Sequence, residues 1–254
     1  MGYPDFDALA HSRDSYLPHR SIRQYIEQYV RHFQIEPYIA LRHRVIRVTS
    51  TCKGWQITVC NLITGVEETN RFDVVVICPG RFWIPRTPSI PSLVNFSGQV
   101  LHTHDYRIRD SFTNQRVVIV GSGPSAIDIA LEVATVAVKI YLLNRGSQFH
   151  GLPPNLQQIG GATLNRFEGK SIFITTTTTD LESVPSELTS IDTVIFATGY
   201  KLNVDFLSFE QCGLRHDYEH DTLHGLYQHL IAIEHPTMAM LSIIEPTISL
   251  PLYH

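Results

Sequence analysis

A short glycine turn between an apolar run and a run of small residues constrains this fold more than any other stretch. The sequence "RVVIVGSGPSAIDIALE" covers residues 116–132. The four apolar residues 117–120 predict a buried strand, and a helix is expected directly after the turn, over about 125–137. A strand, a glycine turn and a helix in this order open a βαβ unit, which predicts an α/β fold containing a parallel sheet.

The individual residues of this turn suit the approach of a pyrophosphate. Gly121 permits the tight turn, and Gly123 has no side chain that would hold phosphates away from the backbone. Ala126 replaces the third glycine of the pattern and still lets the helix pack closely on the strand. Pro124 suits the first helical position, and the helix N-terminus near Ser125 offers N–H groups and a positive dipole end. We therefore predict a dinucleotide site; the alternative is a tight turn without a ligand.

The end of the second strand, "KIYLLNR" (139–145), indicates which dinucleotide binds. An NAD site usually has a carboxylate there, about 20 residues after the glycine turn, to bind the ribose 2′-hydroxyl. This chain has Asn144 and Arg145 instead. Because an arginine can pair with a 2′-phosphate in a two-pronged geometry, we predict NADP(H). The alternative for Arg145 is an ordinary surface arginine.

Composition excludes several classes of protein. The chain is 43% hydrophobic and 17% charged with a net charge of −4, which predicts a soluble globular protein without a nucleic-acid partner. No apolar run approaches the roughly 18 residues that span a bilayer, and no signal peptide is recognisable, so we expect a cytoplasmic protein. The four cysteines form no C-x-x-C pair, which favours reduced thiols and argues against a flavoprotein disulfide reductase.

The residues before the glycine turn have a different pattern. An amphipathic helix is expected over 21–33. Alternation over 44–48 and 55–61 predicts an antiparallel ribbon, and the unbroken apolar run in 72–78 predicts a strand covered on both faces. Residues 79–98 carry four prolines, which predicts an irregular connector at a domain junction.

Three later segments are less regular. The threonine run 175–179 favours an edge strand that ends in a loop. The stretch 192–200 predicts another buried strand that runs into a Thr-Gly turn. His216, His220 and His224 would share one face of a helix and could bind a metal, but the segment forms helix poorly and no cysteine supports it. We therefore predict no metal site.

The stretch "FSGQVLHTHDY" carries a fingerprint, F-x-G-x-x-x-H-x-x-x-[YF], that is formed by Phe96, Gly98, His102 and Tyr106. It resembles the identifying sequence of the flavin-containing monooxygenases and lies just upstream of the glycine turn, as that family requires. Tyr106 favours the N- and S-oxygenating branch, because the Baeyer–Villiger relatives prefer Trp there. Other stretches that look like the family, in order, are "YPDFDA", "SYLPHRSIRQYIEQYVRHF", "GSGPSAIDIA", "FATGY" and "GLYQHLIAIEHPTMAMLSI".

The resemblance implies a nested α/β architecture, in which a Rossmann-like NADP domain is inserted into an FAD domain. We expect a partial FAD-binding domain with the ribbon and the connector at 1–110, the NADP-binding domain at 111–197 and a return segment of the FAD domain at 198–254. Residues 1–120 contain no two glycines in G-x-G spacing. We therefore expect that the first FAD βαβ unit is missing and that the chain is truncated at both ends.

The resemblance also implies an activity. Family members use NADPH, FAD and O₂ to oxygenate soft nucleophilic N or S centres of small molecules through a flavin hydroperoxide, and the cofactor carries the chemistry. The alternative is a truncated, non-catalytic NADP(H)-binding remnant that binds FAD poorly. Apolar faces left uncovered would favour self-association. Family analogy adds the surface of the endoplasmic reticulum to the cytoplasm as a location.

The turn and the resemblance together predict a cofactor site but no catalytic residue. His102 is expected to be structural and to shape the domain junction, and Thr198 and Gly199 are expected to form a backbone turn near the cofactors. The predicted cofactor-binding residues are Gly121, Ser122, Gly123, Pro124, Ser125, Ala126, Ile127, Asp128, Asn144, Arg145, Thr198 and Gly199.

Overall fold

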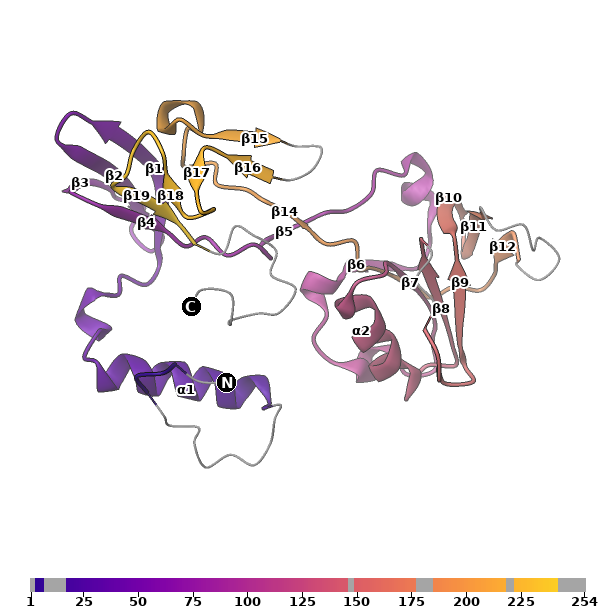
Figure 1. Ribbon diagram of the computed structural model, residues 1–254. Coiled ribbons are helices and arrows are strands. Elements are labelled where there is room, and N and C mark those ends of the chain that lie inside the picture. The colour runs from indigo at the N-terminus through magenta and orange to yellow at the C-terminus, as the bar shows by residue number, and fades with distance from the viewer. Residues whose placement is uncertain (1–2, 7–16, 146–148, 177–184, 218–221, 242–254) are drawn as a thin grey trace. The chain divides into compact units, whose positions relative to one another are not determined.

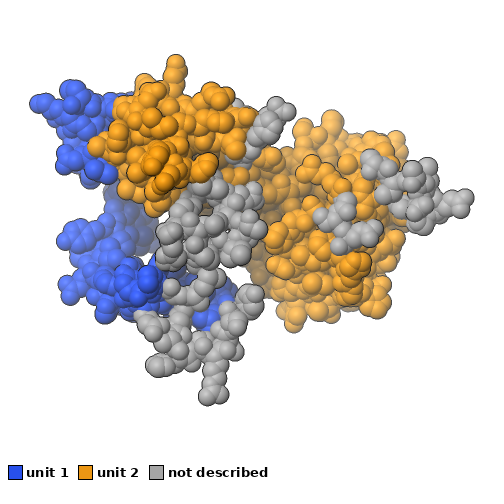
Figure 2. All heavy atoms as spheres, in the orientation of Figure 1, with its two compact units in different colours: residues 1–74, 205–208 blue, residues 75–204, 209–254 orange. Residues whose placement is uncertain are grey.

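The chain forms two compact units, which are coloured separately in Figure 2. Unit 1 comprises Met1–Val74 and Asp205–Ser208, and unit 2 comprises Val75–Val204 and Phe209–His254. A computed structural model describes residues 3–6, 17–145, 149–176, 185–217 and 222–241 (Figure 1). Among these residues, no helix is both long enough and apolar enough to cross a membrane.

Unit 1 contains one long helix and an antiparallel ribbon. The strands are β1 (His43–Thr51), β2 (Gly54–Asn61) and β3 (Glu67–Phe72), which pair in the order β1-β2-β3. The predicted ribbon is therefore confirmed. Trp55 of β2 is 2% exposed, and its burial anchors the ribbon.

The helix α1 (His19–His32) confirms the predicted helix but not a buried apolar face. Only Tyr25 is buried in it, and its hydroxyl accepts a hydrogen bond from the backbone N–H of Tyr3 at 2.6 Å. Ile22 and Ile26 remain 40% and 49% exposed. Self-association through this face stays a prediction.

Unit 2 is built around a five-stranded sheet whose strands are all parallel. The strand order is β6 (Gln99–His102), β13 (Thr193–Phe196), β7 (Arg116–Val120), β8 (Lys139–Asn144) and β9 (Leu156–Gly160). The helix α2 (Pro124–Ala134) follows β7 directly. The predicted βαβ unit and parallel sheet are confirmed. The sheet also includes β6, which lies before the expected domain boundary at 110/111; that boundary stays a prediction.

Alternating side chains of β7 pack against different layers on the two faces of this sheet. Val117 and Ile119 pack in one cluster with Ala130 of α2. Val118 packs on the other face with Phe167, which belongs to a three-stranded antiparallel sheet. That sheet has the order β10 (Ala162–Glu168), β11 (Ser171–Thr176) and β12 (Glu187–Leu188). Because both faces are covered, the three central strands β13, β7 and β8 are almost continuously apolar.

The threonine run contributes to this second sheet differently from the prediction. Thr175 and Thr176 end β11, which is the central strand of the three and not an edge strand. Cross-strand pairing with β10 places Thr175 opposite Thr163. Residues 177–179 of the run lie outside the described residues. The prediction of an edge strand was wrong because β-propensity identifies a strand without identifying its neighbours.

A four-stranded sheet in unit 2 has the order β17 (Leu226–Tyr227), β18 (Ile231–Ala232), β19 (Met238–Met240) and β4 (Val75–Ile77). β4 pairs in parallel with β19, as the apolar run predicted. It is the last strand of the sheet among the described residues, and Val74 and Val76 are 59% and 52% exposed. The prediction that this strand is covered on both faces was therefore wrong for the described part of the chain.

Short elements complete the fold. β5 (Ile84–Pro85) pairs with β14 (Tyr200–Lys201), and β15 (Arg215–Asp217) pairs with β16 (Thr222–His224). The proline-rich connector is thus largely irregular, with one two-residue strand and one short 3₁₀ helix. The 3₁₀ helices are Glu36–Tyr38, Pro91–Asn95, Thr103–Asp105, Arg109–Phe112 and Glu210–Cys212.

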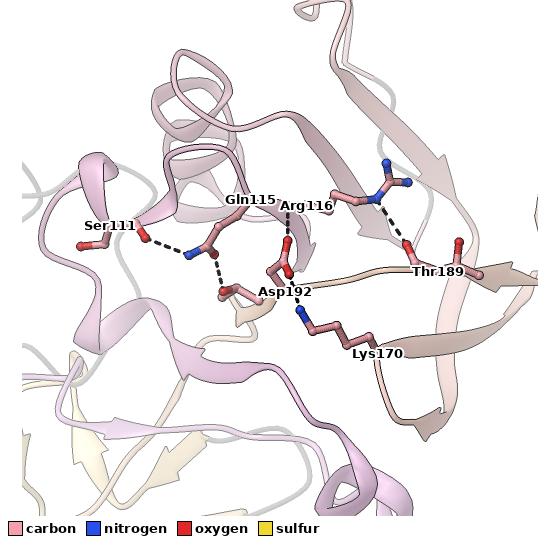
Figure 3. A network of polar contacts seen from close by, with 7 residues as sticks. Ser111, Gln115, Arg116, Lys170, Thr189 and Asp192 are labelled. Atoms are coloured by element: carbon pink, nitrogen blue, oxygen red, sulfur yellow. Dashed lines mark hydrogen bonds and ion pairs between the residues drawn. The ribbon is translucent and has the colours of Figure 1, made fainter.

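A polar network fixes the amino edge of the parallel sheet, where β7 and β13 begin (Figure 3). The Asp192 carboxylate accepts hydrogen bonds from the Lys170 ammonium at 2.7 Å and from the backbone N–H of Arg116 at 3.0 Å. These two donors, Lys170 first, hold the pKa of Asp192 below its usual range. Gln115 links Ser111 to Thr193 through its side-chain amide. The network lies at the edge opposite the glycine turn, so it is structural.

Candidate cofactor site

The glycine turn lies at the point where the order of the parallel strands reverses. From β7 the chain passes through α2 to β8 on one side, whereas β13 pairs with β7 on the other side. In open α/β sheets, ligands bind outside the carboxyl ends of the strands at such a reversal. Topology therefore identifies the same segment as the glycine pattern did. We call residues 121–125 the cofactor turn.

Gly121 begins the cofactor turn in a conformation that other residues rarely adopt. Its φ is 150°, and a Cβ atom there would overlap the carbonyl oxygen of Ala197, which follows β13. The Gly121 N–H donates to the carbonyl of Leu143 in β8 at 2.9 Å. Glycine is thus required because the turn is held between the ends of β13 and β8.

Gly123 has the opposite surroundings. Its φ is −79°, and a Cβ atom there would meet nothing within 4 Å. Among the described residues, the backbone N–H groups of Ser122, Gly123 and Ser125 donate no hydrogen bond, and these residues are exposed. Pro124 occupies the first turn of α2, where its missing N–H leaves nothing unsatisfied. Free N–H groups at a helix N-terminus form an anion site, which a phosphate can approach.

The other predicted residues of this helix divide by burial. Ala126 is fully buried against β7, which explains why a small residue follows the turn. Ile127 is half-buried and Asp128 is exposed. Asp128 therefore has solvent access just after the first turn of α2.

Asn144 and Arg145 follow directly from the strand next to β7. Asn144 ends β8 and is 2% exposed, whereas Arg145 is exposed. β8 pairs with β7 so that Leu143 lies beside Val120, which is the last residue before the cofactor turn. Arg145 therefore follows two residues after the β8 residue that is paired with Val120. In the described part of the chain, the end of β8 carries a guanidinium and no carboxylate.

Thr198 and Gly199 form the turn that leaves β13. The Thr198 hydroxyl donates to the Arg86 carbonyl, and the backbone N–H of Arg86 donates to the Gly199 carbonyl at 2.9 Å. Gly199 has a φ of 79°, which glycine adopts easily. These bonds hold the connector at the carboxyl edge of the sheet. Ala197, the residue before Thr198, lies against Gly121 of the cofactor turn.

The first two fingerprint residues are structural. Phe96 packs on Phe167 with ring centroids 5.4 Å apart, in the core cluster between the parallel sheet and the sheet of β10, β11 and β12. A Cβ atom on Gly98 would overlap both the Asp192 carbonyl oxygen and the Phe96 ring. Gly98 therefore lets β6 begin close beside β13.

The last two fingerprint residues lie near the carboxyl edge. His102 is 5% exposed, and its Nδ1 accepts from the backbone N–H of His104 at 3.0 Å. Burial lowers the pKa of His102, so the ring is neutral near pH 7 with its proton on Nε2. Tyr106 stacks on Phe112 at 5.7 Å, and burial, then the Glu132 carboxylate, raise its pKa. Neither group is poised to transfer a proton.

Sequence reasoning missed a group of aromatic rings beside this edge. Tyr200 lies 5.2 Å from Phe82 and 6.0 Å from His104, and Trp83 lies 6.1 Å from His104, between ring centroids. Phe82 and Trp83 are 59% and 69% exposed. We call Phe82, Trp83, His104 and Tyr200 the aromatic patch. The only sequence signal was two consecutive aromatic residues in a proline-rich connector.

The histidines that raised the possibility of a metal site do not share a helix face. His216 lies in β15 and His224 in β16, and the register pairs them with Leu223 and Arg215. Since neighbouring residues of a strand face opposite sides, the two imidazoles lie on opposite faces of this hairpin. His220 lies outside the described residues. No cluster of three or more metal-ligating side chains is present among the residues that the structure describes.

Comparison with known proteins identifies the family. Residues 1–150 match the model of the flavin-binding monooxygenase-like family. The chain belongs to this family. The flavin-containing monooxygenase FMO GS-OX3 of Arabidopsis thaliana is 30% identical over 82% of this chain and 45% of its own length. Senecionine N-oxygenase of Tyria jacobaeae is 27% identical over 91% of this chain and 49% of its own length.

A solved structure extends the likeness to the fold. The S-allyl-L-cysteine S-oxygenase of Allium sativum is 25% identical, with a TM-score of 0.70 over 89% of this chain and 50% of that chain. The resemblance seen in the sequence and the Rossmann-like α/β fold are thus both confirmed. The chain spans about half the length of the curated relatives it matches.

Proposed function

We propose that this chain binds NADP(H) at the cofactor turn and acts as part of a flavin-dependent monooxygenase for soft nucleophilic N or S centres of small molecules. The observation that carries the proposal is that the cofactor turn is open at the strand-order reversal. A Cβ atom at Gly123 would meet nothing within 4 Å, and the N–H groups of Ser122, Gly123 and Ser125 donate no hydrogen bond among the described residues. The pyrophosphate would accept hydrogen bonds from these N–H groups. Arg145 would pair with the 2′-phosphate, since no carboxylate takes its place.

The substrate class rests on the relatives and on Tyr106. The names of two relatives record an N-oxygenase and an S-oxygenase. Tyr106 occupies the fingerprint place that distinguishes this branch, and its ring stacks on Phe112. O₂ would be the co-substrate.

NADP(H) and FAD fit the described residues unequally. When bound, NADPH supplies a hydride, and in this family the flavin is the group that activates oxygen. The cofactor turn fits the pyrophosphate of NADP(H). The described residues before it contain no second glycine turn between a strand and a helix that would hold the pyrophosphate of FAD. We therefore derive no step at the flavin from this chain.

This misfit favours a second candidate function, which is NADP(H) binding without turnover. Oxygen consumption by the purified chain tests the two, with NADPH, excess FAD and a simple thioether. NADPH-dependent oxygen uptake with sulfoxide formation would support the monooxygenase. We expect no stoichiometric FAD after purification, so NADP⁺ binding without oxygen uptake would support the second candidate. A chain that binds no NADP⁺ would contradict both.

Replacing Arg145 by alanine tests the choice of coenzyme. We expect Arg145→Ala to weaken NADP⁺ binding about tenfold or more, because a charge-assisted pair with the 2′-phosphate is lost. NAD⁺ lacks that phosphate, so its affinity should not change. Isothermal titration calorimetry with both coenzymes measures the difference. Arg166→Ala is a matched control, because Arg166 is an exposed arginine of the same unit whose contacts are with Glu168 and the Phe173 ring. Equal loss of both coenzymes, or of neither, would contradict the role of Arg145.

A further inference from the structure

Two cationic side chains lie side by side at the amino edge of the parallel sheet, at the end opposite the cofactor turn. Arg116 begins β7 and Lys139 begins β8, and the strand register pairs these two residues directly. Both side chains lie on the face of the sheet that carries Val118 and Tyr141, which follow two residues later in the same strands. Like charges paired in this way repel each other and lower stability.

One tyrosine holds both cations. Arg116 Nη2 donates to the Tyr141 hydroxyl at 3.0 Å, and Arg116 Nε donates to the Thr189 carbonyl at 3.3 Å. The Lys139 ammonium lies 5.5 Å from the centroid of the Tyr141 ring, and Arg116 Cζ lies 5.9 Å from it. These contacts fix the guanidinium in place and keep the two positive charges close to each other.

The carboxylate beside this pair is engaged elsewhere. Asp192 accepts from the backbone N–H of Arg116 at 3.0 Å and from the Lys170 ammonium at 2.7 Å. In Figure 3 the Arg116 side chain extends toward Thr189, whereas Lys170 extends toward Asp192. Within the described part of the chain, neither the Arg116 guanidinium nor the Lys139 ammonium has a carboxylate oxygen within 4.0 Å. Two positive charges are therefore not neutralised by an ion pair, in a chain whose net charge is −4.

Tyr141 adds a buried donor to the two charges. The residue is 9% exposed, and its hydroxyl oxygen accepts the bond from Arg116. The hydroxyl hydrogen is then left to donate, and no side chain or carbonyl of the described residues accepts it. A guanidinium, an ammonium and a phenol hydroxyl together offer the charge-assisted donors that a phosphate group accepts.

We infer that Arg116, Lys139 and Tyr141 form a second anion site, which binds the phosphate group of a small molecule or inorganic phosphate. The two cations and the Tyr141 hydroxyl donate to its oxygens. A phosphate fits better than a carboxylate, because it brings nearly two negative charges and three acceptor oxygens. These charges offset the repulsion between Arg116 and Lys139. The site shares no residue with the cofactor turn, so it does not depend on the proposed function.

Calorimetric titration of the full chain with inorganic phosphate, at constant ionic strength, tests this site. Lys139→Gln should weaken phosphate binding about tenfold, because a charge-assisted hydrogen bond is lost. Tyr141→Phe keeps the buried ring and should weaken binding roughly threefold or more. Lys53→Gln is the matched control, because Lys53 is an exposed lysine between β1 and β2. Gly123→Ala, which alters the other anion site, should leave the phosphate affinity of this one unchanged.

Glycerol phosphate as a second probe distinguishes the two sources of the anion. Binding equal to that of inorganic phosphate shows that the site accepts a phosphate ester, and weaker binding shows that it takes the free ion. Lys139→Gln should weaken whichever probe binds.

Thermal unfolding gives a readout that does not depend on heats of binding. Phosphate should raise the Tm of the wild type but not that of Lys139→Gln, since a ligand stabilises only the fold that binds it. Without phosphate, Lys139→Gln should be at least as stable as the wild type, because the repulsion from Arg116 is removed. If phosphate does not bind, or if Gly123→Ala abolishes its binding and Lys139→Gln does not, the inference is overturned. NADP⁺ binding decides the proposed function separately.

Discussion

Replacing Gly121 by alanine is expected to destabilise unit 2 by about 2–4 kcal/mol. Two effects add. The φ of 150° strains any residue with a side chain, and the new Cβ atom would overlap the Ala197 carbonyl. That carbonyl belongs to the backbone beside β13, and the Gly121 N–H is bonded to Leu143 in β8, so neither side can move without disturbing the sheet. Urea unfolding followed by circular dichroism measures the loss.

A matched glycine separates the overlap from the backbone strain. Gly80 also lies in unit 2 and has a φ of 70°, but a Cβ atom there would meet nothing within 4 Å. Gly80→Ala should therefore cost only the strain, about 1 kcal/mol. If Gly121→Ala is no more destabilising than Gly80→Ala, the close contact with Ala197 does not constrain the turn.

Replacing Gly123 by alanine is expected to weaken NADP⁺ binding roughly a hundredfold and to leave the fold intact. The φ of −79° suits alanine, and the added methyl group meets no protein atom within 4 Å. The methyl would instead occupy the space through which phosphate oxygens reach the free N–H groups of the turn. The loss corresponds to one or two charge-assisted hydrogen bonds.

Calorimetry and unfolding together check this second substitution. Stability should fall by less than about 1 kcal/mol, which is the cost of alanine in place of glycine before a helix. A Gly123→Ala chain that is folded and binds NADP⁺ as tightly as the wild type would show that the phosphates do not approach here. Gly121 and Gly123 are separated by a single residue, yet their substitutions are expected to have different effects. Gly121→Ala should lower the stability of unit 2, and Gly123→Ala should lower the affinity for NADP⁺.

Several features of the fold could be predicted from local pattern. The apolar run 117–120, the cofactor turn and the small residues after it predicted β7 and α2 within three residues at each end. Alternating residues predicted the ribbon of β1 and β2. The fingerprint predicted the family, but it did not predict the structural role of its own residues. Its residues Phe96 and Gly98 prove to fit β6 beside β13, a contact between segments about 95 residues apart.

Other features could not be predicted, because they depend on partners distant in the chain. The unbroken apolar run of β4 was read as fully covered, yet Val76 is 52% exposed. The three spaced histidines suggested a helix face, but pairing of β15 with β16 turns His216 and His224 to opposite sides. Exposure and strand order are properties of the assembled sheet, and periodicity within one segment carries no information on either.

The sequence by itself determined that this chain has a strand, a glycine turn and a helix suited to a phosphate, because steric limits on glycine and hydrophobic periodicity act within a few residues. Only the tertiary structure decided that the turn lies at the strand-order reversal, that Gly121 lies against Ala197, and that Phe82 packs on Tyr200. The physical reason is that these contacts join segments separated by up to about 120 residues, and only long-range packing brings them together.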